Sequence, residues 1–330
     1  MSSKLMLDLV DAVSSAPVGT VVAFPVDTAA EVDIVRRWCD ATGNSVLSVL
    51  DTSIEVFRGR ITDPIEALPV ERRPGYRLWV YTNFHCNLSC DYCCVESSPK
   101  ADPRVIPLGE FRDLVGEAVD SGVQELYITG GEPFMLLDLD ERLVAATAFL
   151  PTTVLTNAMV WRGDRLRRLE ALPREGLTLQ ISLDSPTSEL HDRHRGAGSF
   201  ARAIEGVHTA IDLGFRVRVA ATLGTDAGNA EAELQQFFDE LGLQEDQRVV
   251  RRVARQGSAN AGLTVSRTSL IPEVCVTAEG VYWHPVAAID PDMLVTKHWR
   301  PFAAALSAMR DEYRQYRIAG DVLASAFPCA

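Results

Sequence analysis

The chain has 330 residues, of which 47% are hydrophobic and 23% charged, enough for one large domain and a smaller one. Its net charge of −13 argues against non-specific nucleic-acid binding, which needs a basic surface. Seven cysteines, four of them between positions 86 and 94, favour metal chemistry in a reducing compartment. The sequence contains no apolar run of ~18 residues and no signal-peptide core. We therefore expect a cytoplasmic protein with no membrane partner.

Residues 1–62 predict a small two-layer α/β domain. The spacing of apolar residues favours, in chain order, a helix around 5–13, a strand at 21–24, a helix at 30–41 and a β-hairpin over 45–60. Gly43 suits the carboxyl cap of the second helix. Residues 63–75 are rich in proline and charge, and we interpret them as a linker.

From residue 76 to residue 254 the pattern is strand, loop and helix, repeated six times. The expected strands are 77–82, 125–129, 152–156, 177–183, 215–222 and 248–253. The expected helices are 108–121, 140–149, 164–172, 199–213 and 229–241. Serial β/α units give parallel strands joined by right-handed crossovers. The fold class is therefore α/β, as either a partial (β/α)6 TIM-like barrel or an open sheet.

Residues 255–330 do not continue this alternation. They predict a strand pair, Glu273–Thr277 with Val281–His284, and a last helix from Pro301 to about Arg317. We interpret this part as a short C-terminal extension of the barrel.

Three cysteines, Cys86, Cys90 and Cys93, follow directly on the first strand of the repeated pattern. A loop in this place lies at the carboxyl end of the sheet, where such folds build active sites. Three thiolates on one loop can hold three irons of a [4Fe-4S] cluster and leave the fourth iron open. The alternative is a zinc knuckle completed by His85 or Cys94, although structural zinc sites usually carry a second, distant cysteine pair.

The spacing C-x3-C-x-aromatic-C, with Tyr92 as the aromatic residue, resembles the signature of the radical S-adenosylmethionine (SAM) superfamily. The resemblance implies one [4Fe-4S] cluster on Cys86, Cys90 and Cys93, with SAM chelated by the open iron. It also implies reductive cleavage of SAM to a 5′-deoxyadenosyl radical that abstracts hydrogen from a substrate. An electron donor such as flavodoxin or ferredoxin would be the partner.

Further motifs at the ends of later strands fit the same resemblance. Gly130, Gly131, Glu132 and Pro133 look like the GGEP motif that binds the methionine amino group of SAM. By the same resemblance, polar residues at the next strand ends and in the segment after the fourth strand contact the SAM ribose and carboxylate. These residues are Asn157, Ser182, Asp184 and Arg195. Solvated polar strand ends are the alternative for each of them.

The two flanking parts also resemble known families. The segment Cys275–Pro285 resembles the SPASM or twitch extension, with His284 where a cysteine is expected, so we predict no auxiliary cluster there. Residues 1–62 resemble the TusA-like sulfur-carrier fold, but Cys39 falls in the second helix and not in that family's reactive turn. We expect Cys94 to point away from the cluster and to be buried as a small hydrophobe.

Three functional hypotheses follow. The first is a radical SAM enzyme acting on a peptide or a small metabolite in natural-product or cofactor maturation. The second is a non-catalytic protein that holds zinc or an iron–sulfur cluster for structure or sensing. The third is a radical SAM enzyme that inserts sulfur with the help of its N-terminal domain.

Overall fold

A computed structural model describes residues 2–50, 52–59, 63–224 and 230–326. The chain forms two compact units. One contains Met1–Leu68 together with Glu312–Ala330, and the other contains Pro69–Asp311. The boundaries at 62, 75 and 254 inferred from the sequence remain predictions.

The smaller unit has the two-layer α/β fold that its hydrophobic pattern predicts. Its elements are α1 (Ser2–Ser15), β1 (Val21–Pro25), α2 (Ala29–Thr42), β2 (Ser45–Val49) and β3 (Ser53–Phe57). The strands form an antiparallel sheet in the order β1-β3-β2, so the expected hairpin of β2 and β3 is present. Residues 51 and 60, which belong to the predicted hairpin, lie outside the described residues.

Local sequence signals explain where α2 begins and ends. The side chain of Thr28 accepts a hydrogen bond from the Glu31 amide, and the Glu31 carboxylate accepts one from the Thr28 amide, which forms a capping box. Gly43 adopts the left-handed conformation (φ 73°) that ends the helix, as expected. Between these caps, Val35 and Cys39 of α2 are buried in the core of the unit.

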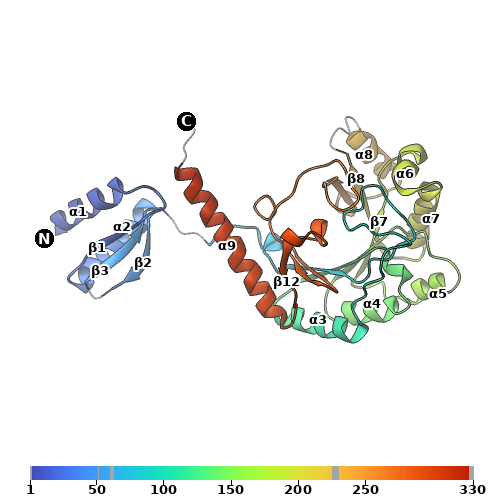
Figure 1. The fold of residues 1–330 in the computed structure, drawn as a ribbon, viewed down its shortest axis with the longest axis horizontal. Coiled ribbons are helices and arrows are strands. Elements are labelled where there is room, and N and C mark those ends of the chain that lie inside the picture. The colour runs from blue at the N-terminus through green and yellow to red at the C-terminus, as the bar shows by residue number, and fades with distance from the viewer. Residues whose placement is uncertain (1, 51, 60–62, 225–229, 327–330) are drawn as a thin grey trace. The chain divides into compact units, whose positions relative to one another are not determined.

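The larger unit is built on a nine-stranded sheet in the order β12-β11-β10-β4-β5-β6-β7-β8-β9. The strands β4 to β9 are parallel, as predicted for the six β/α units. The strand bounds are β4 Arg77–Tyr81, β5 Glu125–Thr129, β6 Thr152–Thr156, β7 Leu177–Ser182, β8 Arg216–Leu223, β9 Arg248–Arg252, β10 Val274–Thr277, β11 Gly280–Tyr282 and β12 Leu294–Thr296. Figure 1 shows α3, α4, α5 and α7 on the outer side of this curved sheet, so the fold is a partial TIM-like barrel.

The helices between the strands match the predicted ones within a few residues at each end, and one was not predicted. Their bounds are α3 Leu108–Asp120, α4 Leu139–Thr147, α5 Asp164–Ala171, α6 Ser188–Arg195, α7 Ser199–Asp212, α8 Ala230–Glu240 and α9 Phe302–Ala326. The sequence pattern predicts no helix between the fourth strand and the helix at 199–213, but α6 lies there. The short, mostly polar α6 lacks the apolar periodicity that identifies longer helices. The last helix extends beyond the expected end near Arg317.

The C-terminal strand pair joins the barrel sheet. β10 and β11 are antiparallel, as predicted, but β10 also pairs in parallel with β4, with Val274 opposite Leu78 and Val276 opposite Val80. This second pairing was not predicted, because the alternation of residues along a strand does not reveal which strand lies next to it. The extension therefore covers the edge of the strand that carries the cysteine loop.

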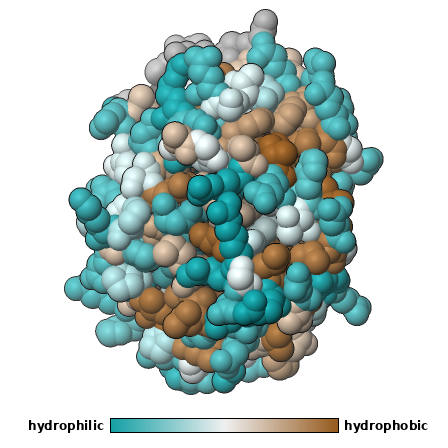
Figure 2. Space-filling model, turned by 90° about the vertical axis from the view of Figure 1, so that its right-hand side faces the viewer, coloured by the Kyte–Doolittle hydropathy of each residue, from teal (hydrophilic) through white to brown (hydrophobic). Residues whose placement is uncertain are grey.

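The outer helices bury one apolar face each. In α3 the residues Phe111, Leu114, Val115 and Ala118 are buried against the sheet, as their spacing predicts. Burial of each large apolar side chain contributes about 1.5–3 kcal/mol to folding. In the face seen in Figure 2, hydrophobic areas are interrupted by hydrophilic residues. Among the described helices, none combines the length and the apolar character that crossing a membrane requires.

Candidate active site

A cavity of about 640 Å³ lies on one face of the barrel sheet and reaches the carboxyl ends of its strands. The alternate residues Arg77, Trp79 and Tyr81 of β4 line it. Most of the site residues predicted from the sequence also line it, namely Cys86, Cys90, Tyr92, Cys93, Gly130, Gly131, Asn157, Ser182 and Arg195. The predicted residues Glu132, Pro133 and Asp184 lie behind this wall and are buried.

The three cysteines of the loop after β4 are free thiols on the cavity wall. The Leu88 amide donates to Cys86 Sγ at 3.4 Å, and the Ser97 amide donates to Cys93 Sγ at 3.3 Å. Hydrogen bonds to sulfur are among the interactions with which proteins tune iron–sulfur clusters. The donor set and its amide contacts therefore fit a cluster held by three cysteines.

Burial raises the pKa of the Cys86 thiol to about 12 and that of Cys90 to about 11, so both are protonated at neutral pH until a metal replaces the proton. Among the described residues, no three His, Cys, Asp or Glu side chains converge as a single bound ion would require. A [4Fe-4S] cluster has no such need, because each thiolate binds a different iron.

The Gly130–Gly131 pair lets two backbone segments pack together. A Cβ atom on Gly130 would lie within 3 Å of the Asn83 carbonyl, and one on Gly131 would lie within 3 Å of the His85 carbonyl. The Gly131 amide donates to the Asn83 carbonyl at 3.0 Å, and the Glu132 amide donates to the His85 carbonyl at 3.0 Å. We expected these glycines to admit a ligand. They also admit the segment that leads into the cysteine loop, which fixes the two loops against each other.

The carboxylate of Glu132 ties the end of β6 to the loop after β5. It accepts hydrogen bonds from the Phe134 amide at 3.0 Å, the Thr156 hydroxyl at 2.8 Å and the Asn157 amide at 2.7 Å. Burial raises the pKa of Glu132 to about 7, although these three donors oppose the rise. Glu132 therefore has a structural task whether or not a ligand is bound.

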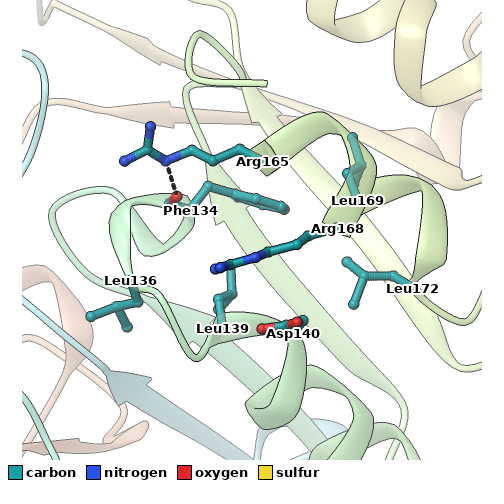
Figure 3. A pocket seen from close by; sticks show the side chains of 8 residues that line it. All are labelled: Phe134, Leu136, Leu139, Asp140, Arg165, Arg168, Leu169 and Leu172. Carbon is teal, nitrogen blue, oxygen red and sulfur yellow. Dashed lines mark hydrogen bonds between the residues drawn. The ribbon is translucent and has the colours of Figure 1, made fainter. Parts of the chain in front are cut away.

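The outer side of the same loop is held by α5. Arg165 Nε donates to the Phe134 carbonyl at 3.1 Å, and Arg168 Nη1 donates to the Leu137 carbonyl at 2.6 Å. Figure 3 shows these two arginines reaching from α5 toward the turn, with Arg168 extending to the neighbourhood of Leu139 and Asp140. The loop that carries the paired glycines is thus fixed on both sides.

The raised pKa of Glu132 predicts a pH-dependent cost to folding. The folded state binds this proton up to about pH 7, whereas an unfolded glutamate loses it near its ordinary value of 4.5. The contribution of Glu132 to the free energy of unfolding is therefore fully present below pH 4.5. As the pH rises to 7, the free energy of unfolding falls by about 3 kcal/mol because this contribution is lost. We expect Glu132→Gln to remove this slope, because an amide does not titrate.

The measurement is the free energy of unfolding of the wild type and of Glu132→Gln between pH 4.5 and 8. The new glutamine side chain also places an N–H donor against the Asn157 backbone amide, which is itself a donor. This lost hydrogen bond lowers the stability of the variant by the same amount at every pH. Only the difference between the two proteins is diagnostic, because burial lowers the pKa of His191 to about 4, which gives both proteins the same opposing slope. A difference that does not change with pH contradicts the prediction.

Asp184, Arg195 and Tyr92 form one buried network. Arg195 Nε donates to Asp184 Oδ2 at 2.5 Å, the Tyr92 hydroxyl donates to the same oxygen, and the Thr222 amide donates to Asp184 Oδ1 at 2.9 Å. Burial raises the pKa of Asp184, but the Arg195 guanidinium and the hydrogen bonds outweigh it and leave the pKa lowered. The network joins the cysteine loop to α6 and to the end of β8.

The helix α6 explains how Arg195 reaches this position. The buried His191 ring accepts a hydrogen bond from the Asp184 amide at 3.2 Å, so the middle of the helix and its carboxyl end, at Arg195, both contact Asp184. Asp192 accepts from the amides of Gly198 at 2.6 Å and Phe200 at 2.8 Å, at the start of α7. His191 and His194 both belong to this helix.

Two other residues of interest, Cys94 and His284, lie on the same cavity wall. The expectation that Cys94 points away from the cluster stays a prediction; Cys94 lines the cavity, and its Sγ lies 3.8 Å from the Tyr81 hydroxyl. His284 also lines it, and its Nδ1 accepts from the Val286 amide at 3.2 Å. Cys39, in contrast, is buried in the core of the smaller unit, with 1% of its surface exposed. Cys329 lies outside the described residues.

Sequence analysis missed the cavity residues that lie within the strands. Trp79 and Tyr127 are opposite each other on β4 and β5, and their rings stack with centroids 4.4 Å apart. Gln180 and Arg218 occupy paired positions on β7 and β8 and line the same cavity. The sequence pattern that could have identified these cavity residues is a polar or amphipathic side chain at alternate positions of an otherwise apolar strand.

Comparison with known proteins connects this geometry to a family. The model of the radical SAM superfamily matches residues 80–241. AlbA of Bacillus subtilis, an antilisterial bacteriocin subtilosin biosynthesis protein, is 36% identical over 140 residues, which are 42% of this chain and 31% of AlbA. The mycofactocin maturase MftC of Mycobacterium ulcerans is 35% identical over 138 residues, 42% of this chain and 36% of MftC. The chain thus spans about a third of the length of these curated relatives.

Two solved structures support the fold. Streptococcus suis SuiB bound to its precursor peptide SuiA aligns with a TM-score of 0.50 at 20% identity, over 72% of this chain and 57% of SuiB. The protein anSMEcpe with bound AdoMet and a peptide aligns with a TM-score of 0.53 at 12% identity, over 72% of this chain and 81% of that chain. Residues 80–241 therefore form a domain of the radical SAM superfamily, whose members use a [4Fe-4S] cluster and SAM.

Proposed function

We propose that this chain is a radical SAM maturase that modifies a peptide. The observation that carries the proposal is the single cavity of about 640 Å³ that brings together the three cysteines, the paired glycines and Arg195. The superfamily match supports the class of reaction. The names of AlbA and MftC and the peptide bound to SuiB support a peptide over a small metabolite.

In this proposal Cys86, Cys90 and Cys93 hold one [4Fe-4S] cluster. When bound, the cluster supplies the electron that splits SAM into methionine and a 5′-deoxyadenosyl radical, which takes a hydrogen atom from the substrate. The superfamily's need for an external reductant makes a flavodoxin or ferredoxin the proposed electron donor.

The chain's own residues bind and orient SAM. The backbone of Gly130 and Gly131 faces the cavity beside the cysteine loop, where main-chain groups are available to the methionine end of SAM. Asn157 and Ser182 lie on the same wall and offer polar groups to the ribose. Asp184 fixes the orientation of the Arg195 guanidinium through two of its nitrogens. The remaining side of the guanidinium is available to bind the carboxylate of SAM.

Anaerobic reconstitution tests the proposal. The full-length protein is loaded with iron and sulfide, reduced with dithionite and supplied with SAM, and 5′-deoxyadenosine is measured. We expect 5′-deoxyadenosine in proportion to the loaded cluster. A protein that holds a full cluster yet forms none would be the non-catalytic binding protein. A colourless protein with one tightly bound zinc would refute the cluster assignment as well.

The sulfur-inserting alternative needs an accessible carrier thiol. Among the described cysteines outside the three-cysteine motif, Cys39 and Cys275 are buried, and Cys94 lines the cavity with its thiol in contact with the Tyr81 hydroxyl. We therefore favour hydrogen abstraction without sulfur insertion. The resemblance of residues 1–62 to the TusA-like fold remains a prediction.

A further inference from the structure

The wall of the cavity carries an excess of positive charge, although the whole chain has a net charge of −13. Among the described residues that line it, five are arginines and one, Glu273, has a carboxylate. The arginines are Arg77, Arg195, Arg218, Arg251 and Arg252. A concave wall of one sign concentrates the field inside the cavity, which favours a ligand of opposite charge.

Three of the five guanidinium groups are already paired with carboxylates. These pairs are Arg77 with Glu125 at 2.9 Å, Arg195 with Asp184 at 2.5 Å and Arg252 with Glu231 at 2.7 Å. Arg218 differs, because its Nη1 donates only to the Tyr127 hydroxyl, at 3.3 Å. The guanidinium of Arg251 forms no hydrogen bond or ion pair within the described part of the chain, although its backbone belongs to the β8–β9 ladder. The guanidinium groups of Arg218 and Arg251 therefore face the cavity without a carboxylate partner among the described residues.

Arg251 stands close to the proposed SAM residues but on a different strand. It is opposite Thr222 in the β8–β9 ladder, and the Thr222 amide holds Asp184. On the other side, burial lowers the pKa of His284, Glu273 opposes this, and the charge of Arg251 lowers it further, which places Arg251 near the C-terminal segment. Arg251 thus lies between the carboxyl end of β8 and the wall formed by residues 284–286.

Arg218 lies deeper along the same wall. It is four residues before Thr222 on β8, a rise of about 13 Å. Its partner Tyr127 stacks on Trp79, and these rings give the deeper part of the cavity an apolar surface next to a positive charge. A substrate that offers a carboxylate to Arg251 and an apolar body to these rings complements both features.

We propose that Arg251, assisted by the field of Arg218, binds a carboxylate of the substrate, so that the chain selects peptides with an acidic group beside the modified residue. Guanidinium suits this task because its planar fork binds both carboxylate oxygens at once. The carboxylate belongs either to a Glu or Asp side chain or to the free C-terminus of the peptide. The inference rests on the proposed function, because it assigns the substrate of that same cavity.

Binding of defined peptides to the full-length, cluster-loaded protein in the presence of SAM tests the inference. The probes are acetylated and amidated pentapeptides Gly-Ala-Xaa-Ala-Gly with Glu or Gln as Xaa, and the Gln peptide with a free C-terminus. Isothermal titration at low salt gives each dissociation constant. We expect the Glu peptide or the free-acid peptide to bind about tenfold more tightly than the neutral one, as a charge-assisted hydrogen bond implies. Which of the two binds identifies the source of the carboxylate.

The variants Arg251→Gln and Arg251→Lys localise the effect. We expect the preference to disappear in R251Q and to return in part in R251K, because lysine keeps the charge but not the fork. The matched control is Arg255→Gln, an exposed arginine four residues further along that bonds to Thr264 Oγ1 and does not line the cavity, and it should keep the full preference.

Several outcomes overturn the inference. Equal binding of charged and neutral peptides to the wild type, including no measurable binding of either, removes the carboxylate site. A parallel loss of SAM affinity in R251Q would place Arg251 in the cofactor site instead. Formation of 5′-deoxyadenosine by the wild type is measured separately, so a failure of the proposed function is distinguishable from a failure of this inference.

Discussion

Replacing Cys86, Cys90 or Cys93 with alanine, one at a time, is expected to abolish cluster binding and SAM cleavage. The three thiols line one cavity, and the variants leave two ligands for a cluster that has only three protein ligands. Loss of a residue that merely supports a metal ligand costs about 10–100-fold in metal affinity or activity. We therefore expect loss of a ligand to exceed 100-fold. Iron content, the visible absorption of the cluster and 5′-deoxyadenosine formation measure the effect.

Two other cysteines are matched controls for this experiment. Cys94 is the immediate neighbour of Cys93, and Cys39 lies in the smaller unit. Alanine at either position should leave iron content and SAM cleavage close to the wild type. If Cys94→Ala loses the cluster as completely as Cys93→Ala, the assignment of ligands by the three-cysteine spacing is wrong.

The second large effect is expected from Asp184→Asn. This change leaves the Arg195 guanidinium, whose side chain is 10% exposed, without its anion. An uncompensated buried charge typically costs about 3–5 kcal/mol. We expect the free energy of unfolding to fall by about that amount in chemical denaturation, and the affinity for SAM to fall because Arg195 loses its orientation.

An exposed ion pair on the same helix provides the contrast. Arg193 and Glu189 of α6 are paired at 3.0 Å, but their side chains are 58% and 81% exposed. Glu189→Gln should change stability by no more than about 0.5 kcal/mol, because solvent screens such pairs. Equal losses for the two variants would show that Asp184 and Arg195 are not coupled in the way their contacts imply.

The sequence predicted the parts of the fold that depend on local patterning. The six parallel strands appear within two residues of their expected ends, because alternating β/α units leave few topologies. Short elements with little apolar periodicity are harder to predict, and no helix is predicted from the sequence at the position of α6. The parallel pairing of β10 with β4 was missed because partner choice depends on contacts between distant residues.

The candidate site was predictable where chemistry is concentrated in one motif. The cysteine loop and the glycine pair could be recognised from their spacing alone. The roles of their neighbours could not, because Glu132 and Asp184 act through hydrogen bonds to residues as far as 92 positions away. The pairing state of Arg218 and Arg251 was equally hidden, since arginines on adjacent strands find partners only once the chain is folded.

The pairing of β10 with β4 has a consequence for synthesis of the chain on the ribosome. The edge of β4 is covered by a strand that emerges about 200 residues later, which at ordinary translation speed takes roughly 10–40 s. During that time the backbone groups along this edge are unsatisfied and available to other nascent chains. Truncation before Val274 would make this temporary exposure permanent, so shortened forms of the protein should aggregate.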